Sequence, residues 1–262
     1  MEQPGYFKAL DGLPLYGVYH APERAAKRAL PVVICPSLFE ERKSAYAPLR
    51  RLALRLQAAG HSVLRFDYRG SGESGGQGAV RRWQHLREDV AVARKTLAKL
   101  AGRRDSILLG LRLGATLALQ ETQRVGGESV IALAPIVKGA AQVRLWKMRS
   151  KIRAELTEGS GQGKSREGGG TMDFDGYELH PSFFDDVAAL DLIKEAGPLS
   201  CPSRIVQIAH KTEALADTTQ LMIALGPRAK LEVLKMEPFW DKLDDVDTAP
   251  LEEMVLKGLN DI

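Results

Sequence analysis

The stretch Ser106–Ala118 reads Ser-Ile-Leu-Leu-Gly-Leu-Arg-Leu-Gly-Ala-Thr-Leu-Ala. Residues 106–109 form an apolar run of strand length, Gly110 and Gly114 enclose a single polar residue, and a helix-forming run follows. A strand, a tight Gly-x-X-x-Gly turn and a helix make the frame of a nucleophile elbow, a turn that presents one side chain above a parallel sheet. Both glycines are needed because backbone segments approach so closely in this turn that a Cβ atom would clash.

The residue at the apex of this turn is Arg112, whereas a catalytic elbow carries Ser, Cys or Asp. A guanidinium stays protonated in proteins and only donates hydrogen bonds, so it cannot attack a carbonyl group. The sequence therefore predicts a catalytic frame without its nucleophile.

Composition limits the classes of protein to consider. The chain has 262 residues, 44% hydrophobic and 27% charged, which is typical of a globular protein with a large core. No apolar run approaches the ~18 residues that span a bilayer, and the N-terminal sequence lacks the pattern of a secretory signal. The two cysteines, Cys35 and Cys201, indicate neither a disulfide framework nor a zinc site. We expect a cytoplasmic protein with no metal and no cofactor, whose net charge of +4 favours anionic ligands weakly.

Strands and helices alternate along most of the chain. The expected strands are 6–9, 15–20, 31–35, 62–66, 106–109, 129–134, 203–209 and 229–236. The expected helices are 47–59, 83–100, the helix after the elbow, 138–156, 187–193, 214–225 and 250–259. The first two strands predict an antiparallel hairpin at a sheet edge, and the later alternation predicts a mostly parallel sheet with helices on both faces.

The alternation breaks between residues 137 and 186. This region predicts a short lid insertion within a single domain of residues 1–262. Its basic part, 138–153, is expected to be a solvated lid face rather than a nucleic-acid or membrane site. The glycine-rich part, Gly159–Gly170, is expected to be a mobile loop and the preferred site of proteolysis. Its start resembles a phosphate-binding loop, but it has three residues between the glycines where that motif needs four.

Three motifs, in this order, resemble the α/β-hydrolase fold in its serine-aminopeptidase-like branch. They are Asp11-Gly12-x-Pro14-Leu15, the loop Asp67-Tyr68-Arg69-Gly70-x-Gly72-x-Ser74, and the elbow Gly110-x-x-x-Gly114-Ala115. A further likeness is to exosortase-associated, hydrolase-like bacterial proteins, through Gly110-Leu-Arg-Leu-Gly-Ala115, Gly176-Tyr-Glu-Leu179 and Pro238-Phe-Trp240. The resemblance implies an α/β-hydrolase fold over nearly the whole chain, except roughly 159–170. Within it, Asp67 and Arg69 are expected to pin their loop as an ion pair.

The resemblance also implies where a catalytic triad would lie, with Ser at the elbow, an acid after strand 203–209 and a His after the last strand. Here the elbow carries Arg112, the acid loop reads His210-Lys-Thr-Glu213, and the base segment Glu237-Pro-Phe-Trp-Asp241 contains no His. The backbone N–H groups of Leu113 and of Leu38 or Phe39 would be the oxyanion donors. Backbone groups survive side-chain replacement, so an anion pocket can persist without chemistry.

Two interpretations of Arg112 remain open. It is either a clamp for an anion at the carboxyl ends of the strands, or a structural partner of Glu40 or Glu41. The candidate pocket residues are Leu38, Phe39, Glu40, Arg112, Leu113 and Trp240.

The sequence thus predicts a non-catalytic relative of the hydrolases that binds a small anionic or acyl ligand, or a protein partner. The alternative is a hydrolase of ester, thioester or amide bonds that uses another constellation. Cys35 is the one conceivable substitute nucleophile, but a Cys in an apolar run is expected to be inert core. A third hypothesis, which rests on the resemblance alone, is a basic scaffold that docks on a membrane or on polysaccharide-assembly machinery.

Overall fold

The structure is a computed structural model, and it describes residues 2–26, 29–76, 82–126, 129–157, 172–174, 176–242 and 246–259. The glycine-rich segment 159–170, with its similarity to a phosphate-binding loop, lies outside the described residues. The expectations for that segment therefore stay predictions.

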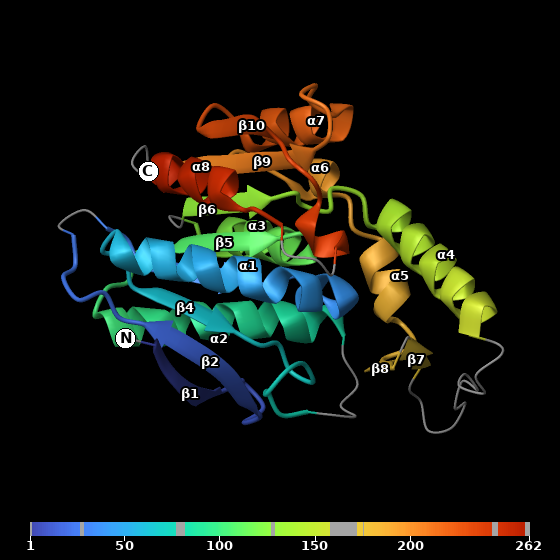
Figure 1. Cartoon of the computed structure of the whole chain (residues 1–262), viewed down its shortest axis with the longest axis horizontal. Helices are drawn as coiled ribbons and strands as arrows, with labels where there is room; N and C mark the ends of the chain where they lie inside the picture. Colours follow the sequence, from blue (N-terminus) through green and yellow to red (C-terminus); the bar gives the residue numbers. More distant parts are fainter. Residues whose placement is uncertain are drawn as a thin grey trace.

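A central sheet of eight strands, in the order β1-β2-β4-β3-β5-β6-β9-β10, organises the molecule (Figure 1). The strands are β1 Glu2–Lys8, β2 Pro14–His20, β3 Val32–Cys35, β4 Val63–Phe66, β5 Ile107–Leu111, β6 Ser129–Leu133, β9 Ser203–Ala209 and β10 Ala229–Lys235. The β1–β2 and β2–β4 pairs are antiparallel, whereas the remaining pairs are parallel. This arrangement confirms the mostly parallel sheet with an antiparallel edge hairpin.

Helices cover both faces of the sheet. The larger ones are α1 Phe39–Ala58, α2 Trp83–Ala101, α3 Leu113–Val125, α7 Ala216–Leu225 and α8 Ala249–Leu259. Strand β3 shows how one sheet serves two cores, because successive side chains point to opposite faces. Val33 and Cys35 join the cluster that contains residues of α2 and α3, while Val32 and Ile34 join the cluster with residues of α1 and α8.

The region between β6 and β9 lies beyond the carboxyl ends of the strands, on the right of Figure 1. It contains α4 Gly139–Thr157, the two-stranded sheet of β7 Met172–Phe174 and β8 Tyr177–Leu179, α5 Phe183–Ala188 and α6 Leu192–Glu195. The start of α4 is pressed against the end of α5, because a Cβ atom on Gly139 would overlap the carbonyl oxygen of Val187. This placement supports the lid interpretation of residues 137–186, which stays a prediction, as does the division of the chain into domains.

Three elements differ from the sequence prediction. Helix α1 begins at Phe39, not at residue 47, because a positive φ of 56° at Phe39 turns the chain directly into the helix and Glu40 and Glu41 suit its N-terminal dipole. The helix expected at 187–193 is two short helices. Helix α5 ends at Ala188, and Asp191 caps the start of α6 by accepting a hydrogen bond from the Lys194 amide. The β7–β8 pair was not predicted, because strands of three residues carry too little periodicity.

Candidate functional site

The elbow is present as the tight turn that the sequence predicts, and its backbone is strained. Arg112 stands between β5 and α3 with φ 56° and ψ −121°. A Cβ atom on Gly110 would overlap the backbone of Ala115, and one on Gly114 would overlap the carbonyl oxygens of Cys35 and Pro36. A non-glycine residue in such a conformation costs on the order of 1–3 kcal/mol, so the surrounding contacts must hold it there.

The guanidinium of Arg112 is held by groups of the protein itself. Nη2 donates to Gln142 Oε1 at 2.9 Å and to Glu41 Oε1 at 3.3 Å. Nε also donates to Glu41 Oε1, at 3.4 Å, and Nη1 donates to the backbone oxygen of Ala134 at 3.3 Å. Arg112 thus pairs with Glu41 and not with Glu40, as one of the two interpretations from the sequence requires.

Trp240 covers the same guanidinium, whose carbon lies 5.0 Å from the centre of the indole ring. Trp240 belongs to the 3₁₀ helix η1 Phe239–Asp241, which follows β10. The resemblance places the catalytic His in this segment. An indole offers a π face that attracts a cation, but it has no basic nitrogen that could take a proton from a nucleophile.

The two neighbouring glutamates differ in environment. Glu41 is 5% exposed, and burial raises the pKa of its carboxyl, while the charge of Arg112 acts in the opposite direction. Glu40 is more exposed and accepts hydrogen bonds from Lys43 at 2.8 Å and from the Tyr177 hydroxyl at 3.2 Å. Glu41 is therefore part of the Arg112 network, whereas Glu40 joins α1 to β8.

The residues proposed for the oxyanion site lie at the starts of two helices. Leu113 is the first residue of α3, and Leu38 and Phe39 form the start of α1. The first N–H groups of a helix have no acceptor within that helix, which makes them donors for an anion. All three side chains are buried. The Phe39 ring packs edge-on against the rings of Trp146 and Tyr177, with 5.1 Å between ring centres in both pairs.

The other residues considered for catalysis are His210, Glu213 and Cys35. His210 and Glu213, after β9, are exposed. Cys35 is fully buried, and burial raises the pKa of its thiol far above the ordinary value, so the reactive thiolate is disfavoured. Within the described part of the chain, no group of three or more His, Cys, Asp and Glu side chains is arranged to hold a metal ion.

A cavity of about 220 Å³ lies beside the Arg112 network. Its lining combines aromatic and polar side chains: Phe39, Glu40, Glu41, Ser44, Trp146, Arg149, Phe174, Tyr177, Trp240 and Asp241. Arg149 from α4 closes one side by donating to Asp241 at 2.7 Å. The cavity thus joins α1, α4, η1 and the β7–β8 sheet, and it brings together Phe39, Glu40 and Trp240 of the predicted residues.

Sequence reasoning missed several residues of this site. Gln142 reaches Arg112 from α4, but a lone Gln in a helical stretch gives no signal. Trp146 and Arg149 were visible only as parts of a basic stretch expected to face solvent. Trp146 is buried and Arg149 pairs with Asp241, so the inner side of α4 belongs to the cavity.

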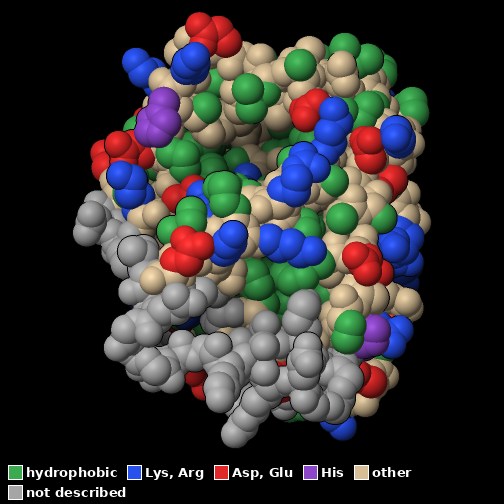
Figure 2. All heavy atoms as spheres, turned by 90° about the vertical axis from the view of Figure 1, so that its right-hand side faces the viewer, with side chains coloured by type: hydrophobic (Ala, Val, Ile, Leu, Met, Phe, Trp, Pro, Cys, Tyr) green, Lys and Arg blue, Asp and Glu red, His purple; other side chains and the backbone are tan. Residues whose placement is uncertain are grey.

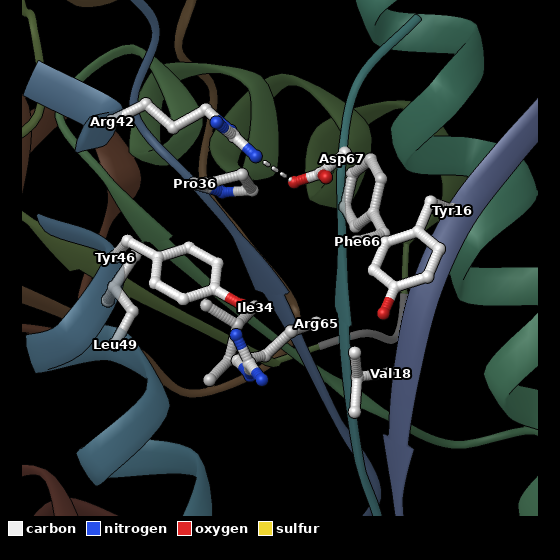
Figure 3. A pocket seen from close by; sticks show the side chains of 10 residues that line it. All are labelled: Tyr16, Val18, Ile34, Pro36, Arg42, Tyr46, Leu49, Arg65, Phe66 and Asp67. Atoms are coloured by element: carbon white, nitrogen blue, oxygen red, sulfur yellow. Dashed lines mark hydrogen bonds and ion pairs between the residues drawn. The ribbon is translucent and has the colours of Figure 1, made fainter. Parts of the chain in front are cut away.

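A second cavity lies between α1 and strands β2, β3 and β4, and Figure 3 shows its lining. The side chain of Arg42 extends from α1 to Asp67 along its edge (Figure 3). Its volume of about 30 Å³ is room for one or two water molecules only. We therefore place the candidate site at the cavity beside the Arg112 network.

The expected ion pair between Asp67 and Arg69 is not formed. Asp67 pairs with Arg42, whereas Arg69 is buried and pairs with Asp89 at 2.7 Å and with Asp11 at 2.9 Å. Both residues do pin the loop after β4, but each uses a partner from another element, which adjacent positions in the sequence cannot reveal.

The face that carries α4 has mixed character. Figure 2 shows Lys and Arg side chains interspersed with Asp, Glu and hydrophobic side chains on this side of the molecule. Lys138, for example, pairs with Asp217 at 2.7 Å. None of the helices in the described part of the chain is both long and apolar enough to cross a membrane.

The mostly parallel sheet, the helices on both faces and the strained elbow define the α/β-hydrolase fold. Residues 32–221 match the model of the family described as "Serine aminopeptidase, S33", and the chain belongs to that family. No curated protein matches the sequence.

Among solved structures, the chain is similar to an esterase of Pyrococcus furiosus, with 14% identity, a TM-score of 0.68, and coverage of 100% of this chain and 91% of that one. It is also similar to a proline iminopeptidase of Mycobacterium smegmatis, with 13% identity, a TM-score of 0.66, and coverage of 99% and 98%. A third is Est1E of Butyrivibrio proteoclasticus with ferulic acid bound, with 17% identity, a TM-score of 0.66, and coverage of 98% and 96%. At these identities the likeness establishes the fold.

Proposed function

We propose that this chain is a non-catalytic, ligand-binding member of its hydrolase family. The observation that carries the proposal is that the elbow presents Arg112, whose guanidinium is bound by other groups of the protein. The elbow aims this side chain into a network of Glu41, Gln142 and the Ala134 carbonyl, and the guanidinium can neither attack a carbonyl nor accept a proton.

The positions around the elbow support the same proposal. A serine hydrolase needs a base within hydrogen-bond reach of its nucleophile, at about 2.6–3.2 Å. Here the corresponding segment provides Trp240, which contacts the guanidinium through its ring. Two separate changes, at the elbow and after β10, would have to be reversed before the Ser–His chemistry could operate.

The cavity beside Arg112 supports a role in ligand binding. The cavity of about 220 Å³ is lined by five aromatic rings and by polar groups, the combination found in small-molecule sites. A small ligand is the occupant that we propose, and a protein partner is the second possibility. A cytoplasmic setting and the closer likeness to exosortase-associated proteins belong to the same proposal and rest on the sequence alone.

The alternative function is hydrolysis of an ester, thioester or amide through another constellation. The observation in its favour is the retained elbow strain at Arg112, because strain of this kind gathers at functional sites. This alternative needs a nucleophile, and Cys35, the candidate from the sequence, is fully buried with a disfavoured thiolate.

Activity-based labelling separates the two functions. We expect the purified protein to resist fluorophosphonate probes and to show no turnover of short acyl esters, acyl thioesters or aminoacyl amides above a heat-inactivated sample. A competent serine hydrolase is the positive control. Turnover that a single substitution abolishes would overturn the proposal, and loss of that turnover in Cys35→Ser would establish the alternative.

A further inference from the structure

We propose that the cavity beside Arg112 binds a cationic alkylammonium group. This inference rests on the proposed function, since it names the ligand class of the same site. It departs from the anionic ligand that the net charge and Arg112 suggest, and the reason lies in which groups face the cavity.

Aromatic side chains make up half of the described residues that line the cavity. Phe39, Trp146, Phe174, Tyr177 and Trp240 come from α1, α4, β7, β8 and η1, so the lining rings belong to several elements. The electron-rich face of an aromatic ring attracts a cation, and quaternary ammonium groups are bound in cages of such rings. The site already shows this chemistry, because the Arg112 guanidinium lies 5.0 Å from the Trp240 ring centre and Lys43 Nζ lies 5.6 Å from that of Tyr177.

The charged lining is more acidic than basic. Glu40, Glu41 and Asp241 line the cavity, whereas Arg149 is the one basic side chain among the described lining residues, and it is engaged with both oxygens of Asp241. Arg112 and Lys43, the cations that pair with Glu41 and Glu40, are outside the lining. A ligand in the cavity therefore meets two carboxylates whose positive partners are not among the described lining residues.

In each of these two carboxylates, only one of the two oxygens accepts a hydrogen bond from a described residue of the protein. Arg112 binds only Oε1 of Glu41, and Lys43 and Tyr177 bind only Oε1 of Glu40. Among the residues that the structure describes, Oε2 of either side chain has no hydrogen-bond partner. Glu41 is 5% exposed, so water screens the charge of this carboxylate little.

An anion would bind more weakly than a cation in this cavity. The Arg112 guanidinium already donates to Glu41, Gln142 and the Ala134 carbonyl, and an entering anion would have to displace them while facing Glu40 and Glu41. The volume of about 220 Å³ is below the ~300–1,000 Å³ of sites for drug-sized ligands, so the cavity suits a head group of modest size.

Three probes of nearly equal shape and different charge test the inference. They are choline, which carries a quaternary ammonium, its uncharged isostere 3,3-dimethylbutan-1-ol, and the anion 3,3-dimethylbutanoate. We expect calorimetric titration to show choline binding at least tenfold more tightly than the alcohol, and the carboxylate binding most weakly. Equal affinities for choline and the alcohol, tightest binding of the carboxylate, or no binding of choline would each overturn the inference.

Variants locate the binding. Glu40 is partly exposed, so Glu40→Gln should fold normally and weaken choline at least threefold without changing the alcohol. Glu253→Gln removes the same charge from the exposed side of α8 and should leave choline binding unchanged. Equal loss in both variants would mean that choline responds to overall charge, against the inference.

The proposed function fails separately. Turnover of esters or labelling by fluorophosphonates would overturn the non-catalytic proposal whatever choline does. A protein that shows no turnover and prefers the alcohol or the carboxylate would keep the proposed function and refute the ammonium site.

Discussion

At the scale of the residue, Arg112 is the side chain that carries the proposed function. A catalytic elbow presents a nucleophile to substrate, whereas this elbow presents a guanidinium to Glu41 and Gln142. The strain costs on the order of 1–3 kcal/mol, and a buried ion pair with further hydrogen bonds can offset a cost of that size. The elbow of this chain is therefore consistent with a structural role at the centre of the site.

Restoring serine should make the protein less stable without making it active. Arg112→Ser leaves Glu41 buried without its cation, which typically costs roughly 3 kcal/mol or more, and a serine hydroxyl without an adjacent base stays weak as a nucleophile. We expect a lower denaturant midpoint and no ester turnover. Turnover by this variant would mean that a base lies within reach of the elbow, against the proposed function.

Two companion variants test the physical reasons. The double change Arg112→Ser with Glu41→Gln should recover part of the lost stability, because no buried charge remains unpaired. Arg112→Gly should be more stable than Arg112→Ala by about 1 kcal/mol, because glycine adopts the φ of 56° without strain. Equal stability of the glycine and alanine variants would contradict the assignment of strain to this position.

Cys35 gives a second prediction at this scale. The thiol is fully buried at the end of β3 and its pKa is raised by burial, so it should not react with Ellman's reagent in the native protein at pH 8. Cys201 is also buried, and both thiols should react in guanidinium chloride. Fast stoichiometric reaction of the native protein, lost in Cys35→Ser, would reopen the possibility of a cysteine nucleophile.

At the scale of the element, the position of α4 depends on its first residue. Gly139 lies so close to the Val187 carbonyl that a Cβ atom would overlap it, and its amide donates to the Leu190 oxygen at 2.9 Å. Gly139→Ala should therefore shift the helix or lower the free energy of unfolding by roughly 2–3 kcal/mol, as overpacking does. Urea denaturation monitored by circular dichroism measures the change.

Gly197→Ala is the matched control, since nothing lies within 4 Å of a Cβ atom there and its φ is not in the left-handed region. It should be neutral or stabilise by up to about 1 kcal/mol through the unfolded state. Similar losses in both variants would show that the contact at α4 does not set its position.

At the scale of the whole molecule, the sequence was informative where structure is local or periodic. The apolar runs and the two elbow glycines predicted the strands, the mostly parallel sheet and the tight turn at Arg112. The continuous run of α1 across Pro48 could not be predicted, because a proline usually indicates the first turn of a helix.

The site was predicted less completely, because its contacts join distant segments. Glu41 was one of two named candidates for the partner of Arg112, but Gln142 and Asp241 are brought to the cavity only by the packing of α4 and η1. The same limit applies to Arg69, whose buried partner Asp89 comes from α2. Local sequence predicts that a group is present, while tertiary packing determines what it pairs with.

The stability of the whole chain should fall in mild acid because of His20. This side chain is fully buried in β2, its Nε2 accepts a hydrogen bond from Arg65 at 3.0 Å, and burial, with the charge of Arg65, lowers its pKa from 6.5 to about 4 although Glu2 opposes this shift. Below pH 6.5 the unfolded chain binds a proton that the folded chain does not, so the free energy of unfolding decreases as the pH falls. The loss amounts to roughly 3 kcal/mol between pH 6.5 and 4, and Glu41, whose pKa is raised, acts in the opposite direction.

Urea midpoints at pH 7.5, 5.5 and 4 should show a steeper decline for the parent and for His210→Gln, which changes an exposed His, than for His20→Gln. Parallel declines in all three proteins would show that the imidazole of His20 is not held neutral in the folded protein.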